Sequence, residues 1–408
     1  MTLEQLKNVV VVGAASAGLF TAQSLAKSLP DTHRVVLIEA NPVAYWSIGA
    51  LRAAVQPGFE DKIIHDLTND TVFGANTRHV VLAGTRVVDL LTDGAVVNRD
   101  VTASLPGSET LKGEGEGEGV KTKVQADKVV LAVGADYGFP SRISPSSSTK
   151  DDVLREFQQM QKEIAAAQEI LVIGGGPTGV EFVGEVLDEH PNKVVTLLTR
   201  GPGLVTNGKD SFAGLSSKLL SQLQNLGVRV ILNDSLSADD LSTGPLGESK
   251  TFTTEKGQKI SADYLMLSSG GKPSTGWIRA IDSSIIDPDT SLITVTPTFS
   301  IASSSPRWAN YYALGDAAST PGPKTSYIAQ QHGPALAHNI VTAINAAGNT
   351  TSSKLKKAGG PPGNMIVVPL GKSGGASYLM FFSVGGWLTS LAKGKTLFVD
   401  MFHKWFQA

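Results

Sequence analysis

The chain has 408 residues, with 35 lysines and arginines against 37 aspartates and glutamates, a formal net charge of −2, and no cysteine. This length suggests roughly two or three domains. The near-neutral charge argues against a nucleic-acid partner. The absence of cysteine excludes disulfides, thiolate nucleophiles, iron–sulfur clusters and CxxC redox pairs. The histidines show no metal-binding spacing, so we expect no metal site and infer that any redox chemistry depends on a bound organic cofactor.

A strand, a glycine-rich turn, a helix and a second strand follow one another near the amino terminus. Residues 9–12 are four consecutive valines, typical of a strand buried on both faces of a parallel sheet. The apolar spacing predicts a helix over 19–29. Glu39 ends the second strand, where a carboxylate accepts hydrogen bonds from a ribose. The turn residues expected to approach a pyrophosphate are Gly13, Ala15, Ser16, Ala17 and Gly18.

This first turn departs from the usual glycine pattern at its middle position. Ala15 stands there, and its methyl group faces the closest approach between backbone and phosphate. We therefore expect a slightly displaced pyrophosphate. The alternative interpretation is a tight turn that binds no ligand.

A second unit of the same kind begins about 160 residues later. The strand 170–173 leads into a turn, a helix is predicted over 180–187, and the next strand spans 193–198. That strand is followed by Arg200 instead of a carboxylate, so we predict that NADPH is tolerated or preferred over NADH. The alternative is a solvated arginine. The turn residues expected to hold the nucleotide are Gly174, Gly176, Pro177, Thr178 and Gly179.

Two further segments carry a resemblance to a known family. Residues 310–318, N-Y-Y-A-L-G-D-A-A, predict a short strand that ends in Gly-Asp, and residues 131–135 read L-A-V-G-A. With the glycine turns, they resemble the flavoproteins that have two dinucleotide-binding domains. The resemblance implies that the first unit binds FAD, that the second binds NADH or NADPH, and that Asp316 holds the ribityl chain of the flavin. The alternative role of Asp316 is a turn or helix-cap carboxylate.

Shorter stretches narrow this resemblance. Residues 48–54, 57–59, 323–329 and 397–399 are similar to the apoptosis-inducing-factor-like group, and within it to the ferroptosis-suppressor type (mitochondrion-associated inducer-of-death homologue) of quinone oxidoreductases. The similarity covers about residues 9–399. It implies an α/β fold with two Rossmann-like domains, as in glutathione reductase, and a small C-terminal α+β unit. The expected segments are 1–140 and 276–355 for FAD binding, 141–275 for NAD(P)H binding, and 356–408 for the C-terminal unit.

The resemblance also implies roles for single residues near the two cofactors. Glu181 is expected beside the nicotinamide carboxamide, although an acid near a helix start is also favoured by the helix dipole. Gln331 is expected near the electron acceptor, or else is a helix-surface amide. The other residues implied for FAD are Arg52, which has a surface salt bridge as its alternative, together with Thr85, Gly134 and Lys324.

Aromatic residues are concentrated at the C-terminus. Read as a helix, the segment 397–406 places Phe398, Met401, Phe402 and Trp405 on one face. This face has four alternative roles. They are core packing, coverage of the acceptor side of the flavin by Phe398 with Lys393 nearby, contact with a membrane surface, and homodimer formation. The uncharged stretch 373–392 is long enough to cross a bilayer. Because glycines interrupt it, we expect two short buried strands instead.

The predicted activity is transfer of hydride from NAD(P)H to FAD, followed by passage of electrons to a small-molecule acceptor of the quinone type. No disulfide intermediate is available without cysteine. Three alternatives stay open: an NAD(P)H oxidase, a ferredoxin-type reductase, and a redox-sensing flavoprotein whose dimerisation NAD(P)H controls. We expect a cytoplasmic protein, or one peripheral on membranes.

Overall fold

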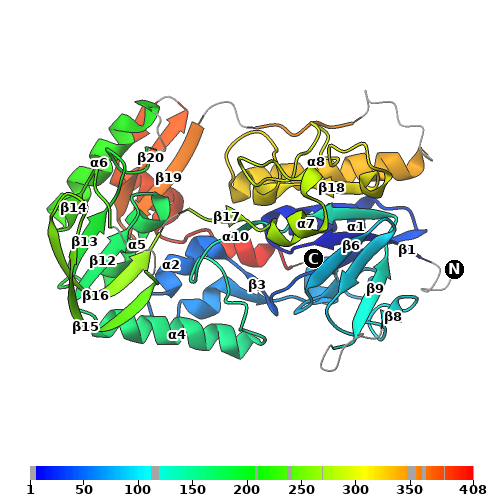
Figure 1. Cartoon of the computed structure of the whole chain (residues 1–408), viewed down its shortest axis with the longest axis horizontal. Coiled ribbons are helices and arrows are strands. Elements are labelled where there is room, and N and C mark those ends of the chain that lie inside the picture. The colour runs from blue at the N-terminus through cyan, green and yellow to red at the C-terminus, as the bar shows by residue number, and fades with distance from the viewer. Residues whose placement is uncertain are drawn as a thin grey trace.

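The computed structural model describes residues 6–111, 119–206, 210–236, 241–268, 270–346, 355–360, 364–380 and 382–407. Its largest elements are two five-stranded sheets with helices packed on them (Figure 1). The α/β fold class expected from the sequence is confirmed.

The first sheet is entirely parallel, and its strands come from distant parts of the chain. Alternate valines of its central strand belong to two different buried clusters, so this sheet is covered on both faces. Helices α1 (Ser16–Ser28) and α8 (Ser326–Asn345) pack closely beside it. The strand order is β18 (Tyr311–Ala313), β10 (Lys128–Leu131), β1 (Lys7–Val12), β2 (His33–Ile38) and β5 (Val80–Leu82).

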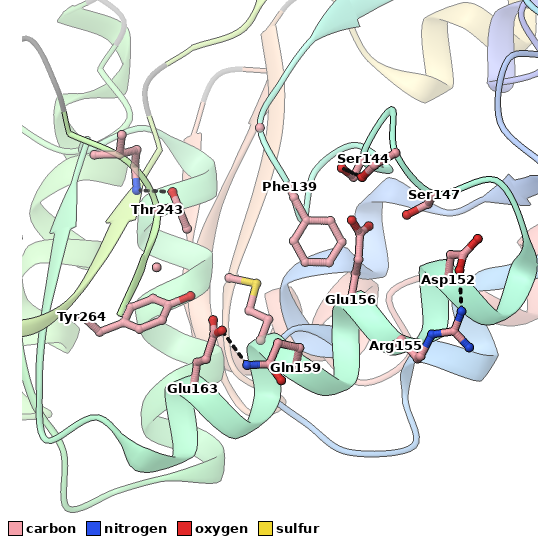
Figure 2. A pocket seen from close by; sticks show the side chains of 15 residues that line it. Phe139, Ser144, Ser147, Asp152, Arg155, Glu156, Gln159, Glu163, Thr243 and Tyr264 are labelled. Carbon is pink, nitrogen blue, oxygen red and sulfur yellow. Dashed lines mark hydrogen bonds and ion pairs between the residues drawn. The ribbon is translucent and has the colours of Figure 1, made fainter. Parts of the chain in front are cut away.

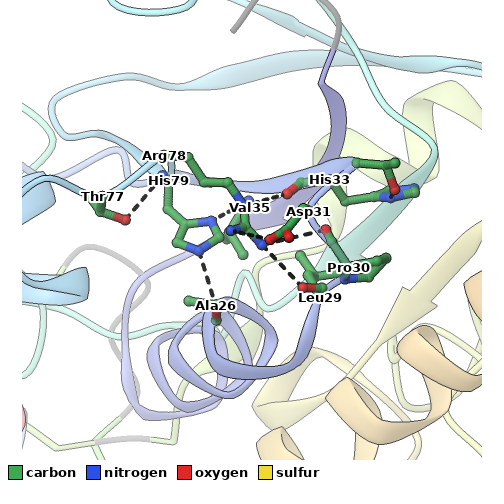
Figure 3. A network of polar contacts seen from close by, with 10 residues as sticks. Ala26, Leu29, Pro30, Asp31, His33, Val35, Thr77, Arg78 and His79 are labelled. Carbon is green, nitrogen blue, oxygen red and sulfur yellow. Dashed lines mark hydrogen bonds and ion pairs between the residues drawn. The ribbon is translucent and has the colours of Figure 1, made fainter. Parts of the chain in front are cut away.

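A polar network fixes the start of β2 against the end of α1 (Figure 3). His79 accepts a hydrogen bond at Nδ1 from the backbone N–H of Val35 (3.0 Å), and its Nε2 lies 3.3 Å from the carbonyl oxygen of Ala26. Arg78 donates to the carbonyl oxygen of His33 (2.8 Å) and pairs with Asp31. The network supplies partners to backbone groups at the amino edge of the sheet, opposite the glycine turn.

The second sheet repeats this plan with one antiparallel edge strand. It is accompanied by α4 (Lys150–Ala166), α5 (Pro177–Glu189) and α6 (Ala213–Asn225). A short antiparallel ladder, β11 (Ala135–Asp136) with β17 (Lys272–Pro273), pairs segments that flank this second unit in the chain. The strand order is β14 (Arg229–Ile231), β13 (Val194–Leu198), β12 (Glu169–Ile173), β16 (Lys259–Leu267) and β15 (Gly244–Thr253).

Smaller elements complete the first unit, and one of them comes from later in the chain. An antiparallel four-stranded sheet covers the second face of the first sheet, and a ladder of β3 with β4 lies near the short helix α2. The elements are β3 (Val43–Tyr45), α2 (Ala50–Ala53), β4 (Ile64–Asp66), α3 (Asn69–Phe73), β6 (Val87–Leu91), β7 (Gly94–Val97), β8 (Glu109–Leu111), β9 (Lys121–Gln125) and α7 (Gly276–Ile281).

The C-terminal unit bridges both halves of the molecule. Its sheet of β19 (Asn364–Leu370), β20 (Gly374–Met380) and β21 (Phe382–Val384) packs on α5 and α6. Helix α9 (Gly386–Thr389) and a π-helical turn (Ser390–Gly394) follow, and α10 (Val399–Lys404) then reaches the first unit near β3 and α2 (Figure 1). The uncharged stretch 373–392 thus forms two strands, as expected, but β21 is not buried and carries the exposed Phe382. The stretch also forms a helix that was not expected.

Candidate functional site

The first glycine turn has a backbone that only glycine accommodates at its two ends. Gly13 has a φ of +102°, and a Cβ there would lie 2.4 Å from the carbonyl oxygen of Ala132. A Cβ on Gly18 would lie 1.8 Å from the carbonyl oxygen of Gly13. The N-cap of α1 is Ala15, whose exposed side chain provides no cap. The first amides of this 13-residue helix can therefore meet an anion.

Glu39 lies directly beside this turn. One carboxylate oxygen accepts a hydrogen bond from the backbone N–H of Ala14 (2.5 Å), and the other accepts one from the N–H of Asn41 (2.9 Å). The side chain is therefore fixed between the end of β2 and the turn, where a dinucleotide-binding unit places its ribose.

The Gly-Asp motif at the end of β18 lies against the start of α1. Gly315 has a φ of +77°, and a Cβ added to it would lie 3.0 Å from the Cβ of Ala17. The hydroxyls of Ser16 and Ser326 are 2.7 Å apart and connect the amino ends of α1 and α8. Burial raises the pKa of Asp316, while the positive charges of Lys324 and Arg142 act in the opposite direction. Two helix starts and this acid thus converge on one region.

Lys324 and Gly134 border the same region. The ammonium group of Lys324 donates to the carbonyl oxygens of Ala318 (2.5 Å) and Thr320 (3.0 Å). Gly134 has a φ of +70°, and a Cβ there would lie 2.8 Å from a guanidinium nitrogen of Arg142. Both residues support the loops around Asp316.

Two residues expected at FAD have other partners in the structure. Thr85 is buried, and its hydroxyl lies between the carbonyl oxygen of Ala83 (3.2 Å) and Nε of Arg99 (2.7 Å). Arg52 is not on the surface. Its guanidinium is buried and forms a two-bond ion pair with Glu185 (2.7 and 2.8 Å). The surface salt bridge considered for Arg52 is therefore a buried pair, while its role at FAD stays a prediction.

The second glycine turn shows the same geometry with more open space. Gly174 has a φ of +128°, and a Cβ there would lie 2.5 Å from the hydroxyl oxygen of Ser268. A Cβ on Gly179 would lie 2.1 Å from the carbonyl oxygen of Gly174. A Cβ on Gly176, by contrast, would have no described atom within 4 Å. Gly176 is also the N-cap of α5, so the open space lies at the positive end of a 13-residue helix.

The remaining residues expected at the nucleotide surround this turn. Pro177 and Thr178 form the first helical positions of α5 and are half-buried. Arg200 is exposed just after β13, and a Cβ on Gly175 would lie 2.8 Å from Cβ of the adjacent Thr199. Arg200 therefore directly follows a residue that contacts the second glycine turn.

Glu181 and Lys393 form a buried ion pair. Nζ of Lys393 lies 2.7 and 2.9 Å from the two carboxylate oxygens of Glu181. Burial raises the pKa of Glu181, and the positive charge of Lys393 opposes this shift. Glu181 lies in the second turn of α5, not the first, so the helix dipole is a weaker reason for an acid here. Two residues that the sequence placed near the reaction thus meet, although 212 positions separate them.

The other two candidates near the acceptor lie apart in the fold. Gln331 is exposed on α8, which packs against α1. Phe398 is half-buried at the N-cap of α10, and its φ is +57°. Trp46 stacks on Phe402 with ring centroids 5.5 Å apart and donates to the carbonyl oxygen of Leu397 (2.7 Å). The aromatic stripe of α10 is therefore largely core packing against the first unit.

Sequence reasoning missed Glu185 and the pairing of Arg52. A signal was present, because Glu181 and Glu185 are the only charged residues between positions 174 and 187 and lie four positions apart. Acids on a helix with an apolar face require buried cations as partners. Which cations these are depends on the tertiary structure.

A cavity of about 780 Å³ lies between α4, the linker 138–147 and β16 (Figure 2). Phe139, Met160 and Leu267 form part of its apolar wall, while the side chains of Glu156 and Tyr264 contribute polar atoms. None of the cofactor residues expected from the sequence is among the described residues around it. Among the described residues, neither glycine turn lines the cavity, although Leu267 directly precedes Ser268, which contacts the second turn.

Two parallel sheets, each with a glycine turn at the carboxyl end of its central strand, define the class of two-domain dinucleotide-binding proteins. The particular family follows from comparison with known proteins. The family model of the pyridine nucleotide-disulphide oxidoreductases matches residues 7–338, and the chain belongs to this family. The family implies FAD and NAD(P)H, and the chain is an oxidoreductase.

Relatives match over nearly the full length. Ferroptosis suppressor protein 1 of Taeniopygia guttata is 26% identical over 402 residues, which cover 98% of this chain and 96% of the relative. Apoptosis-inducing factor homolog B of Dictyostelium discoideum is 25% identical over 419 residues, covering 98% and 97%. These matches confirm the resemblance inferred from the short sequence stretches.

A solved structure shows the same fold. The sulfide:quinone oxidoreductase from the hyperthermophilic bacterium Aquifex aeolicus superimposes with a TM-score of 0.68 and 16% sequence identity, over 98% of this chain and 91% of that chain. Within the described part of the chain, no helix combines the length and apolar character needed to cross a bilayer.

Proposed function

We propose that the chain is an FAD-dependent NAD(P)H oxidoreductase that passes electrons to a quinone-type acceptor. The observation that carries the proposal is the buried Glu181–Lys393 pair, which joins the helix of the second glycine turn to the C-terminal unit. When bound, FAD and NAD(P)H supply hydride transfer and electron transfer. A chain without cysteine cannot use a disulfide relay, so a diffusing acceptor must take the electrons.

The residues around the first turn fit FAD. The uncapped amides of Ser16, Ala17 and Gly18 would hold the pyrophosphate, and Glu39 would accept hydrogen bonds from the ribose. Asp316 would hold the ribityl chain, with Lys324 and Gly134 shaping the loops around it. Thr85 would act indirectly, because its N–H donates to the carbonyl oxygen of Glu39 (2.8 Å).

The residues around the second turn fit NAD(P)H. Gly176 leaves space for a pyrophosphate, and the first amides of α5 point toward it. Arg200 would pair with a 2′-phosphate, which favours NADPH. Glu181 would accept a hydrogen bond from the nicotinamide carboxamide, and Lys393 would keep that carboxylate ionised and oriented.

We assign the acceptor side of the flavin to Phe398 and Gln331. Phe398 is the N-cap of α10, and Gln331 lies on α8. In support of a quinone, one relative of the same fold is named as a sulfide:quinone oxidoreductase. Neither residue contributes a titratable group. Their proposed role is therefore to shape the acceptor site and to exclude water.

Membrane contact is proposed through a different surface from the one expected. The stripe on α10 is packed against Trp46 and Phe20, whereas Trp387 and Leu391, in α9 and the π-helical turn, are 72% and 65% exposed. Residues 364–399 contain three lysines and no carboxylate. Of these lysines, Lys393 pairs with Glu181 and Lys372 lies 3.8 Å from Asp188, while Lys395 is exposed just after the π-helical turn. Exposed apolar side chains close to a lysine fit an anionic lipid surface. Homodimer formation stays a prediction.

The proposal is tested by anaerobic turnover of the purified protein with NADH or NADPH, in the presence and absence of a soluble quinone. We expect sustained oxidation of the nucleotide, beyond one equivalent per flavin, only when quinone is added, with NADPH at least as effective as NADH. Equal rates in a parallel assay in air without quinone would favour an oxidase. Reduction of a ferredoxin but not of quinone would overturn the proposed acceptor.

A further inference from the structure

A buried cluster of four charged side chains joins three parts of the chain. Glu181 and Glu185 lie one helical turn apart on α5, Arg52 comes from α2, and Lys393 comes from the π-helical turn. Glu185 pairs with Arg52, and Glu181 pairs with Lys393. The four formal charges therefore cancel inside the protein.

Arg52 does more than neutralise Glu185. Its Nε and Nη2 donate to the two carboxylate oxygens of Glu185 at 2.7 and 2.8 Å. Nη2 also donates to the carbonyl oxygen of Gly394 (2.6 Å), and Nη1 donates to that of Lys395 (3.1 Å). A single guanidinium thus connects α5 to the two residues that directly follow Lys393.

We infer that Arg52 is a positioning residue that holds the Gly394–Lys395 backbone so that the ammonium group of Lys393 meets Glu181. The inference rests on the proposed function, in which Glu181 holds the nicotinamide. A planar guanidinium with five donors can bind a carboxylate and two carbonyls together, which an ammonium group cannot do in this geometry. The two carbonyl contacts also satisfy donors of the buried guanidinium, and they fall on the two residues that directly follow Lys393.

The placement of Lys393 can be measured without catalysis. Acetylation of the purified full-length protein by limiting acetic anhydride, followed by mass spectrometry, reports how accessible each lysine is. In Arg52→Gln we expect Lys393 to react several times faster than in the wild type. The matched control is Arg34→Gln, because Arg34 is also buried and donates to Asn8 (2.7 Å) and to the carbonyl oxygen of Pro106 (3.1 Å). It should leave Lys393 unchanged.

A second variant guards against a folding defect, since Arg52→Gln leaves Glu185 buried without a partner. Arg52→Met combined with Glu185→Leu removes both charges and keeps an apolar interior. We expect this variant to fold and still to expose Lys393 to acetylation. Unchanged reactivity of Lys393 in both variants would overturn the inference.

A double-mutant cycle tests whether Arg52 affects flavin reduction through Lys393. We expect Arg52→Gln to slow flavin reduction by NADPH roughly tenfold to a hundredfold, as for a misplaced positioning group. In a Lys393→Met background the same change should add almost nothing, because the two residues act through one contact. If the double variant slowed flavin reduction by the product of the two single-variant factors, the inference would be contradicted. If NAD(P)H does not reduce the wild-type flavin, the proposed function fails, and the acetylation experiment still decides the role of Arg52.

Discussion

Gly174 and Gly176 lie two positions apart in the second glycine turn, yet a methyl group would meet different surroundings at each. At Gly174 it would lie 2.5 Å from Ser268, whereas at Gly176 it would enter open space. Gly176→Ala should therefore leave the melting temperature unchanged and weaken NAD(P)H binding roughly tenfold or more, about 1.4 kcal/mol. Gly174→Ala should lower both the melting temperature and the affinity for NAD(P)H. Isothermal titration and thermal unfolding of the two variants measure this contrast, and equal behaviour would contradict it.

Arg200 determines the preference between the two pyridine nucleotides in this account. A charge-assisted hydrogen bond contributes about 1.5–3 kcal/mol, so Arg200→Ala should lower kcat/KM for NADPH by roughly tenfold to a hundredfold and leave that for NADH nearly unchanged. Arg229 is an exposed arginine at the opposite, amino end of the neighbouring strand β14. Arg229→Ala is the matched control and should alter neither value. A loss shared equally by both nucleotides would refute the role of Arg200.

His79 makes stability depend on pH. Burial, with a contribution from Arg78, lowers its pKa from 6.5 to about 4, and its neutral ring accepts the hydrogen bond from Val35. The folded pKa lies below the unfolded one, so the contribution is fully present above pH 6.5. This contribution to the free energy of unfolding is lost as the pH falls toward 4. The loss from His79 alone amounts to about 3 kcal/mol. In urea unfolding, His79→Leu should be less stable near pH 7 and should lose correspondingly less stability on acidification. An identical slope in the variant would rule this out.

At the scale of elements, the strands and the glycine turns were predictable, but the boundaries of the helices were not. The apolar spacing starts the first helix at Leu19, whereas α1 begins at Ser16 inside the turn. The turn residues are small and carry no periodic signal, and their helical conformation follows from the packing of α1 on α8. Likewise, a helix was expected through Phe398, but Leu397 and Phe398 have φ values of +48° and +57°. The contact of Trp46 with Leu397, which the local sequence cannot indicate, ties this bend to the first unit.

The element formed by α9 and the π-helical turn should determine attachment to lipid. Trp387→Ser combined with Leu391→Ser should reduce binding to vesicles that contain anionic lipid by roughly tenfold or more, because two exposed apolar side chains are removed. Val194→Ser with Leu226→Ser is the matched control, since both residues are exposed and apolar but lie on the second unit. Vesicle co-sedimentation measures the difference. Equal binding of both double variants would contradict a membrane role for this element.

At the scale of the whole molecule, the site is assembled from parts that the chain order separates. The sequence indicated both nucleotide turns and named Glu181 and Lys393 individually, because each follows a local pattern or a resemblance. It did not indicate Arg52 as the link between them, since α2, α5 and the C-terminal unit meet only in the folded chain. The C-terminal unit packs on α5 and α6 while α10 packs on the first unit. Together with the direct Arg52–Glu185 pair, it therefore holds both nucleotide-binding units together.

The most direct test of the central claim is an absorption spectrum of the freshly purified protein, followed by anaerobic titration with NADPH. The account predicts a flavin spectrum from one FAD per chain, and bleaching of that spectrum by one equivalent of the nucleotide. A colourless protein that also fails to take up added FAD, or a bound flavin that neither NADPH nor NADH can bleach, would contradict it.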